Sequence, residues 1–343
     1  MVSCALDGRV VVVTVTYGRR WHLLSRTIER ARQEGSDGVI VIDNGSEDNI
    51  LSLVSDLYGG FCSVIQIDRN IGSAGGFKAG FEEALKSDFD FVLLLDDDNC
   101  LEIGALIKLR KAFDVELSAL PLGSSSGLIV TAFRSDHHPE IAMGFPPDRV
   151  NPRPSSYIGF HIVDLPRKLI RRIFPVTKNR KGLVEINKVE LNFAPWGGLF
   201  FHRSLIGRFG FPLENFVLYI EDTEYTWRVT SGGGKIVLIT SAEVEDIDKS
   251  WNVTAPGTNP GGIASLILGE GDFRVYYRMR NLAFFQRHIL PQSFLKTVNF
   301  YMYWSIVFLF AVRYRRLDRW RLICVALRDG HAKRLGVSPL FPL

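Results

Sequence analysis

The run VVVVTVTY at residues 10–17 constrains the fold more than any other segment, because almost all of its residues are β-branched. Such residues favour extended strands, and a run without polar alternation is typical of a strand buried on both faces. Apolar residues with helical spacing follow at Trp21, Leu24, Ile28 and Ala31. The segment therefore predicts a parallel strand followed by a crossover helix.

The same alternation continues to residue 100. Further apolar runs at 38–43, 62–70 and 91–96 are separated by segments with helical spacing. This pattern predicts an α/β fold with an open, Rossmann-like, mostly parallel sheet flanked by helices. In such sheets ligands bind at the carboxyl ends of the strands.

Three consecutive aspartates, Asp96 to Asp98, end the apolar run FVLLL. Their carboxylates repel one another, and no cation lies close in sequence, since Lys108 and Arg110 come a helical turn or more later. Hard oxygen ligands of this kind suit Mg²⁺ or Mn²⁺, which also bind substrate phosphates. The alternative, a solvated turn or a helix N-cap, explains one aspartate better than three.

Other polar residues follow neighbouring strands. Asp43 and Arg69–Asn70 stand at strand ends, so we expect them to converge with the aspartates on one crevice. Asp43 could cap its own turn or accept from a nucleobase N–H. The glycines of RNIGSAGGFKAG could form a tight turn, or let the backbone approach a diphosphate, with Lys78 in the first helical turn.

The segment YIEDTEYTWR carries three acids, Glu221, Asp222 and Glu224, directly after the apolar segment FVLY. Acidic residues at a helix N-terminus are favoured by the helix dipole alone. A carboxylate at the mouth of an apolar crevice is equally suited to act as a general base. Both interpretations stay open on sequence grounds.

Net charge and cysteine content limit the partners and the cellular compartment that we expect for this chain. The net charge of +4 is too small to indicate a nucleic-acid partner. The cysteines Cys4, Cys62, Cys100 and Cys324 are scattered, which argues against a disulfide framework or a zinc site and favours a reducing cytoplasm. Asp7 and Arg9 interrupt any apolar core near the N-terminus, so we expect no export signal.

The C-terminal part contains a candidate membrane contact. Its uninterrupted apolar run, residues 300–312, is shorter than the ~20 residues of a spanning helix. An interfacial helix and a buried helix are the two interpretations. Basic residues are concentrated in segment 165–181 and in Arg313–Arg321, and they either contact anionic head groups or form a solvated surface.

Seven segments occur together in an order and spacing that resemble family 2 glycosyltransferases of the GT-A fold. They are VTVTYGRR, VIDNGSED, RNIGSAGGFKAG, LLLDDD, PWGGLFFHR, EDTEYTWRV and YYRMRN. The resemblance covers about residues 8–290 and is greatest to bacterial rhamnosyl- and galactofuranosyltransferases of cell-envelope polysaccharide synthesis. It implies a domain 1–290, with a nucleotide-binding half at about 8–120 and an acceptor-binding half at about 121–290. A C-terminal helical segment, 291–343, would follow.

The resemblance also implies roles for individual residues. Nucleotide or donor binding would fall to Thr16, Tyr17, Arg19, Asp43, Arg69, Asn70, Lys78, Asp96 and Asp97. Asp98 would be the principal metal ligand, with Asp96 as a further one. Asp222 would be the catalytic base, supported by Glu221 and Glu224. Trp196, Gly197 and Gly198 would shape the floor where donor sugar and acceptor meet.

Two positions depart from the family pattern. Gly18 stands where asparagine is usual, and no histidine follows the base at the expected metal-ligand position. Asp246 or Asp248 could supply the third ligand, and His288 is a remote candidate.

The expected activity is an inverting, Mn²⁺- or Mg²⁺-dependent transfer from a nucleotide sugar to a lipid-linked glycan at the inner face of the cell membrane. UDP-galactofuranose is the first expected donor and dTDP-rhamnose the second. A sugar nucleotidyltransferase and a catalytically inactive nucleotide-sugar-binding protein are the alternatives.

Overall fold

The computed structural model describes residues 4–121, 124–135, 137–142, 150–166, 187–248, 263–269 and 271–343. The chain divides into two compact units. Unit 1 comprises Met1–Pro147, Ile186–Lys249 and Leu343, and unit 2 comprises Asp148–Glu185 and Ser250–Pro342. The expected boundary at residue 290 therefore falls inside unit 2. The basic segment 167–181 lies outside the described residues.

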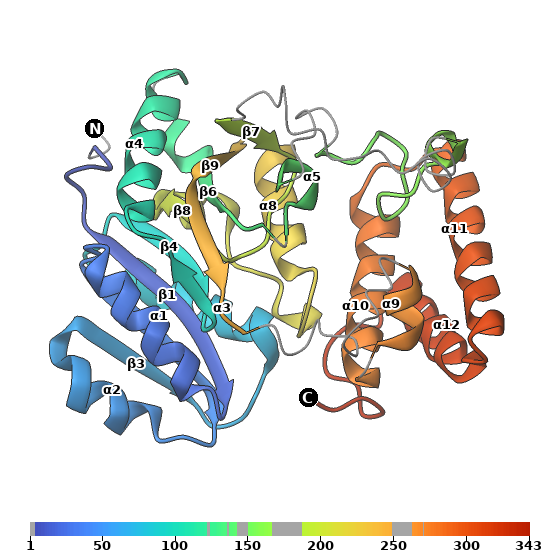
Figure 1. The fold of residues 1–343 in the computed structure, drawn as a ribbon, viewed down its shortest axis with the longest axis horizontal. Helices are drawn as coiled ribbons and strands as arrows, with labels where there is room; N and C mark the ends of the chain where they lie inside the picture. The colour runs from blue at the N-terminus through green and yellow to red at the C-terminus, as the bar shows by residue number, and fades with distance from the viewer. Residues whose placement is uncertain are drawn as a thin grey trace. The chain divides into compact units, whose positions relative to one another are not determined.

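Unit 1 is built on a sheet with the strand order β3-β2-β1-β4-β8-β6-β9-β5, and β7 also pairs with β9 (Figure 1). Its strands are β1 (Val10–Gly18), β2 (Gly38–Ser46), β3 (Cys62–Ile67), β4 (Phe91–Asp96), β5 (Asn99–Leu101), β6 (Leu128–Phe133), β7 (Lys188–Leu191), β8 (Leu199–His202) and β9 (Lys235–Asp246). Strands β3, β2, β1 and β4 run parallel, as do β6 and β9. The predicted α/β architecture is confirmed.

Helices cover both faces of this sheet. They are α1 (Trp21–Gln33), α2 (Ile50–Tyr58), α3 (Gly72–Lys86), α4 (Ala105–Ser118), α5 (Pro139–Ala142), α7 (Ser204–Phe209) and α8 (Glu221–Ser231), with short 3₁₀ turns η1 (Gly59–Phe61), η2 (Ser124–Gly127) and η5 (Glu214–Phe216). Helices α1, α2 and α4 share one apolar core with the sheet. Helix α3 packs on the opposite face, against β1 and β2.

The alternation of side chains along β1 explains the two layers. Val10 and Val12 belong to the core beneath α1, α2 and α4. Val13 and Val15 point to α3, where a Cβ at Gly80 would lie 2.4 Å from Val13 Cγ1 and one at Gly76 would lie 2.5 Å from Val15 Cγ1. These two glycines therefore allow α3 to approach the sheet closely.

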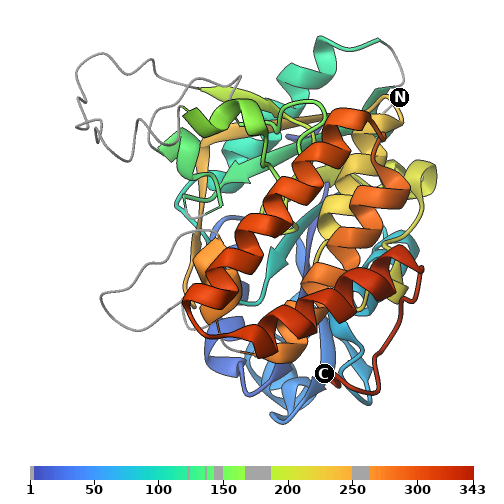
Figure 2. The same cartoon turned by 90° about the vertical axis from the view of Figure 1, so that its right-hand side faces the viewer.

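Unit 2 is helical in its described part. It contains the 3₁₀ turn η4 (Ile162–Asp164), α9 (Ile263–Leu268), α10 (Asp272–Phe284), the π-helical turn η6 (Phe285–Ile289), α11 (Phe294–Arg313) and α12 (Leu317–His331). Helix α10 packs against α12, and α11 contacts both α9 and α12; Figure 2 shows these helices in orange and red.

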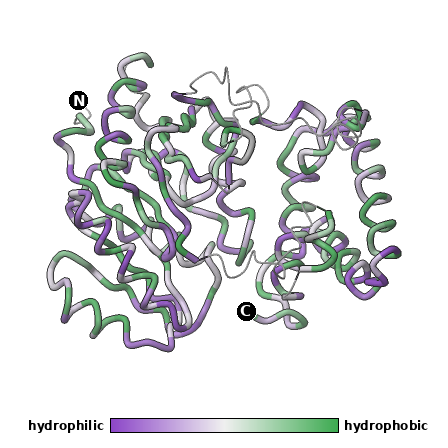
Figure 3. Tube along the Cα trace, in the orientation of Figure 1, coloured by the Kyte–Doolittle hydropathy of each residue, from purple (hydrophilic) through white to green (hydrophobic). Residues whose placement is uncertain are grey.

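Helix α11 is longer than its uninterrupted apolar run, and its 20 residues are long and apolar enough to cross a membrane. Only 28% of its most apolar window is buried, and the helix is mostly green in Figure 3. Its other face is packed, since Asn299 accepts from Ile162 N and Trp304 donates to the Tyr157 hydroxyl. One apolar helix is weak evidence of a membrane span, and the packed polar face fits a helix that lies on its unit.

The close contact of α3 with the sheet leads to a stability test. Gly80→Ala places a methyl group against the buried, stiff Val13 side chain, and we expect the free energy of unfolding to fall by about 1–3 kcal/mol. Gly207→Ala is the matched control, because this exposed glycine of α7 has open space around its Cβ position. The control should leave stability unchanged or raise it by about 0.5–1 kcal/mol. Urea denaturation measures both, and equal losses would contradict the close packing.

Candidate functional site

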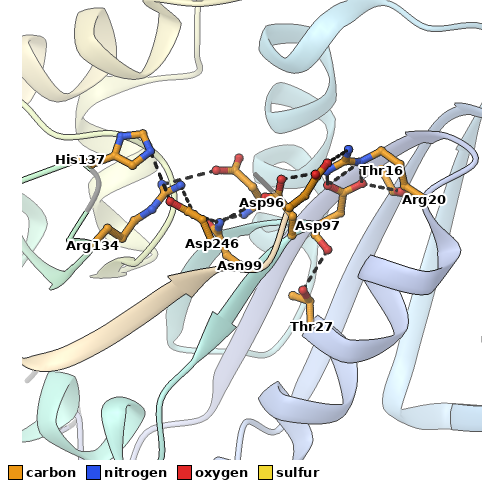
Figure 4. Close-up of polar contacts among 11 residues, drawn as sticks. Thr16, Arg20, Thr27, Asp96, Asp97, Asn99, Arg134, His137 and Asp246 are labelled. Atoms are coloured by element: carbon orange, nitrogen blue, oxygen red, sulfur yellow. Dashed lines mark hydrogen bonds and ion pairs between the residues drawn. The ribbon is translucent and has the colours of Figure 1, made fainter. Parts of the chain in front are cut away.

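The three aspartates lie where β4 opens into a turn. Strand β4 ends at Asp96, and the turn leads into β5, which pairs antiparallel with the end of β9. In that pairing Asn99 stands opposite Asp246, and its side-chain amide donates to Asp246 Oδ1 over 2.7 Å. Asp246, a predicted third ligand, is thereby brought beside the aspartate turn (Figure 4).

Arg20 is the main residue that the sequence analysis missed. Its Nε donates to Asp97 Oδ2 at 2.9 Å, its Nη2 to Asp98 Oδ2 at 2.9 Å, and its Nη1 to Asp248 Oδ2 at 2.8 Å. The predicted Arg19 instead pairs with Glu47, and its side chain is 79% exposed. Neither arginine stands out from the other in the sequence, so only the fold separates their roles.

Asp97 is a structural residue in this arrangement. It is buried and accepts from the Thr16 hydroxyl at 2.8 Å as well as from Arg20. Its backbone carbonyl accepts from the Thr27 hydroxyl. Thr16 is itself fully buried, so the two residues predicted to bind nucleotide bind each other.

Arg134 is a second missed residue. It contacts Asp246, and its Nη1 lies 3.5 Å from Asp96 Oδ2 (Figure 4). A Cβ on Gly197 would lie 2.3 Å from Arg134 Nη1, so the predicted floor glycine is needed to admit this guanidinium. His137 Nε2 lies 3.6 Å from Asp246 Oδ2. Two arginines that are distant in sequence therefore offset part of the negative charge of the aspartate cluster.

Asp96 and Asp98 fit a divalent cation. Burial raises the pKa of both carboxyl groups, and the repulsion between them adds to the increase for Asp98. Each also contacts an arginine that lowers its pKa, Arg134 for Asp96 and Arg20 for Asp98. Oxygen ligands under mutual repulsion suit Mg²⁺ or Mn²⁺, which need only one or two carboxylates beside substrate phosphates. Within the described ranges, no group of three His, Cys, Asp or Glu side chains is arranged to hold a metal.

The end of β2 lies beside the end of β1, where Asp43 stands opposite Thr16. Asp43 is buried and its Oδ1 accepts from Ser46 N at 2.9 Å, which confirms the turn-capping interpretation for one of its oxygens. Asn44, which the sequence analysis missed, donates to Asn70 Oδ1 and to the Gly72 carbonyl. Asn70 therefore joins β2 to the start of α3.

Three predicted donor-binding residues lie nearer the surface. Tyr17 is 37% exposed, and the Arg20 guanidinium lies 5.3 Å from its ring centroid. Arg69 is exposed just after β3. Lys78 pairs with Glu214 at 2.8 Å, and it lies beyond the first turn of α3, because that helix begins at Gly72. The expectation that Lys78 lies in the first helical turn was wrong.

Trp196 links α3 to α8 through aromatic contacts. Its ring lies 5.2 Å from that of Phe77, 5.8 Å from that of Phe81 and 5.5 Å from that of Tyr225. The side chain is buried, and its Nε1 has no hydrogen-bond partner within the described chain. Gly198, with φ +95°, allows the adjoining turn.

The neighbouring acids Glu221 and Asp222 have opposite surroundings. Glu221 is 3% exposed; Oε1 accepts from Ser73, and Oε2 has no partner among the described residues. Burial raises the pKa of this carboxyl to about 8, and the charge of Asp222 adds to the increase. Burial also raises the pKa of Asp222, but hydrogen bonds from Thr223 and the charge of Arg134 oppose it. The structure therefore favours a protonated Glu221, whereas the contacts of Asp222 limit the rise of its pKa.

The approach to α8 is strained. Val217, Tyr219 and Ile220 have φ values of 67°, 68° and 69°, which are unusual for residues other than glycine. Ala74 N donates to the Val217 carbonyl, and Gly72 leaves room for that carbonyl. This loop therefore holds the first turn of α8 against the start of α3. Glu224 has a different role, because it pairs with Arg228 one helical turn later.

Comparisons with known proteins agree with this architecture. Residues 11–156 match the family model described as glycosyl transferase family 2. No curated protein sequence matches the chain. Among solved structures, TarS 1–349 of S. aureus, in complex with UDP-GlcNAc, has a TM-score of 0.52 and 13% identity over 94% of this chain and 80% of its own.

A second solved structure, GalNAc-T7 with UDP, GalNAc and Mn²⁺, has a TM-score of 0.50 and 13% identity. The match covers 85% of this chain and 54% of that chain, so this chain corresponds to about half of GalNAc-T7. At this identity the likeness shows a shared fold.

Arg20 provides a test of the charge network. Arg20→Gln leaves the buried Asp97 carboxylate without its partner, so we expect the free energy of unfolding to fall by about 3–5 kcal/mol at pH 7. Arg19→Gln removes the same chemical group from an exposed pair and should cost less than about 1 kcal/mol. Denaturant titration compares the two variants, and an equal loss from both would contradict the assignment.

The pH dependence of stability tests whether Glu221 is protonated in the folded state. Its carboxyl group keeps its proton in the folded state up to about pH 8, whereas an unfolded glutamate loses it near its ordinary pKa. Between these values the folded state binds more protons, so wild-type stability should fall as pH rises, by at most about 1.4 kcal/mol per pH unit from this group. Glu221→Gln should remove that slope in melts between pH 5 and 8. The exposed control Glu243→Gln should follow the wild-type profile; a Glu221→Gln profile parallel to wild type would refute the protonated state.

Proposed function

We propose that this chain transfers a sugar from a nucleotide-sugar donor to an acceptor hydroxyl, because residues 11–156 match the model of glycosyl transferase family 2. The observation that carries the proposal is the proximity of Asp222, which accepts hydrogen bonds from Thr223, to the carboxylates at the end of β4. The charge of Asp222 is among the causes that raise the pKa of Asp96, after burial, so the two groups lie within electrostatic range.

Asp222 is the proposed base. Of the first-turn acids of α8, Glu221 is held in its protonated form and Glu224 is paired with Arg228. Asp222 alone combines partial exposure with hydrogen bonds to its charged form. A base must be ionised at the operating pH, and these surroundings favour Asp222 for that role.

The reaction requires one displacement. Asp222 accepts the proton of the acceptor hydroxyl as its oxygen forms a bond to the anomeric carbon. The bond from that carbon to the donor phosphate breaks, and the nucleoside diphosphate leaves with the electron pair. A single displacement inverts the anomeric configuration, and one base suffices for it.

Asp98 and Asp96 would hold Mn²⁺ or Mg²⁺, which offsets the charge that develops on the leaving diphosphate when bound. Oxygen atoms of the diphosphate would complete the coordination, because such cations take further ligands from substrate phosphates. Asp246 and Asp248 each contact an arginine in this structure, as Asp96 and Asp98 do. Arg20 and Arg134 keep these carboxylates close together. The Mn²⁺ and UDP named for GalNAc-T7 support these choices.

For the donor we propose a UDP-sugar, with galactofuranose first, and dTDP-rhamnose as the second candidate. The UDP-GlcNAc named for TarS supports UDP. The acceptor we propose is a lipid-linked glycan at the inner membrane face, and the apolar exposed face of α11 supports that location.

Replacement of the base provides the test. Asp222→Asn should lower transfer by at least about 10²-fold while nucleotide binding is retained, because only proton removal is lost. Asp98→Ala should abolish the dependence on Mn²⁺. Asp56→Asn, an exposed change on α2, is the control and should keep wild-type rates.

Nucleoside diphosphate release from UDP- and dTDP-sugars, with and without Mn²⁺, measures these effects. Release of inorganic diphosphate instead would indicate a nucleotidyltransferase. No turnover of any donor, with unchanged nucleotide binding by Asp98→Ala, would contradict the transferase. Full activity of Asp222→Asn would contradict the assigned base.

A further inference from the structure

Unit 2 contains a buried lysine without an acidic partner. Lys296, in the first turn of α11, is 5% exposed. Its Nζ donates to the Gln286 carbonyl at 2.6 Å and to the Pro291 carbonyl at 3.1 Å. An ammonium group has three donors, and the third has no acceptor in the part of the chain that the structure describes. Burial lowers the pKa of Lys296 to about 8, so the group remains charged at neutral pH.

Lys296 lines a cavity of about 220 Å³. The other lining residues are Tyr157, Gln286, Arg287, Gln292, Thr297, Phe300, Tyr301 and His331, and none of them is acidic. Neither Arg287 nor Lys296 has a carboxylate within 4 Å among the described residues. After burial, the charge of Arg287 is the next cause that lowers the pKa of His331, so these two basic side chains lie within electrostatic range of each other. Such a cavity favours an anion.

One of the lining residues also carries an unpartnered polar atom. Gln286 is 8% exposed, and its Oε1 has no hydrogen-bond partner within the described ranges. This residue lies in η6, a π-helical turn, and such turns are frequent at functional sites. A buried unpaired amide atom costs free energy unless a ligand or water binds it. The volume suits a small head group rather than a whole cofactor.

An exposed apolar surface adjoins the cavity. Phe294, Tyr301 and Leu309 of α11 are 85%, 66% and 63% exposed. Their spacing of seven or eight residues places them on one face of the helix, which we call the α11 stripe. Tyr301 belongs to both the stripe and the cavity wall. Arg313 and Arg315 are exposed at the end of the helix, so the stripe ends in positive charge.

We propose that this cavity binds the phosphate group of a membrane lipid while the α11 stripe contacts its apolar chains. Lys296 and Arg287 supply the positive charge, and Gln286, Gln292 and Thr297 supply polar contacts. The positive charge of the cavity complements a lipid phosphate, and Tyr301 belongs to both the cavity wall and the α11 stripe. Both features favour a phospholipid surface over a neutral apolar partner. The inference rests on the proposed membrane association and is independent of the proposed sugar transfer.

Vesicle binding by the full chain provides the test. We compare phosphatidylcholine vesicles that contain phosphatidylglycerol with vesicles given the same charge by oleate, which has no phosphate. Wild type should bind the phosphatidylglycerol vesicles more tightly. Arg287→Gln and Lys296→Gln should each lower that binding about fivefold and remove the preference. The matched control Arg313→Gln should weaken binding to both vesicle types equally.

The outcomes separate the possible occupants. A phosphate preference that persists in Arg287→Gln overturns the proposal, and this exposed residue can be changed without a buried contact being lost. If the protein binds inorganic phosphate but no vesicles, the proposal that the phosphate group belongs to a lipid is wrong. A dimer that Leu309→Gln dissociates, without vesicle binding, assigns the stripe to a second copy. Donor turnover measured on the same preparations reports the transferase proposal separately.

Discussion

The Arg20 guanidinium binds carboxylates from the end of β4 and from the segment after β9. Together with Arg134, it holds five aspartates at the edge of the sheet where the parallel strands end and ligands commonly bind. Buried charges of one sign cannot be assembled without such partners, because desolvation and repulsion would both oppose folding. The geometry of the candidate site depends on this pair of arginines.

Once the aspartates are held, local surroundings divide the chemistry among the acids. Asp97 is buried and fixed by Thr16 and Arg20, whereas Asp96 and Asp98 are partly exposed. In α8, Glu221 Oε2 is buried without a partner among the described residues, whereas Asp222 accepts from Thr223. Residues of the same type thus take structural, ligand and base roles because their neighbours differ.

In unit 2 the buried charge is positive rather than negative. Lys296 is buried against carbonyl groups with no acid beside it, and the cavity around it lacks acidic residues. Helix α11 packs its polar face through Asn299 and exposes an apolar one. The charge and the apolar surface therefore lie at adjacent places on one helix, which is the arrangement an anionic lipid surface requires.

The sequence by itself determined the strands β1 to β4, the helices between them and the polar residues at their ends, because β-branched runs and helical spacing are local signals. It placed Asp43 and Asp96 to Asp98 at these ends, and Asp222 in an acidic segment that follows an apolar one. Only the tertiary structure decided that Arg20 rather than Arg19 enters the cluster, that Asn99 pairs with Asp246, and that Arg134 approaches Gly197. These contacts join segments tens to more than two hundred residues apart, through strand pairing and close packing that no local pattern encodes.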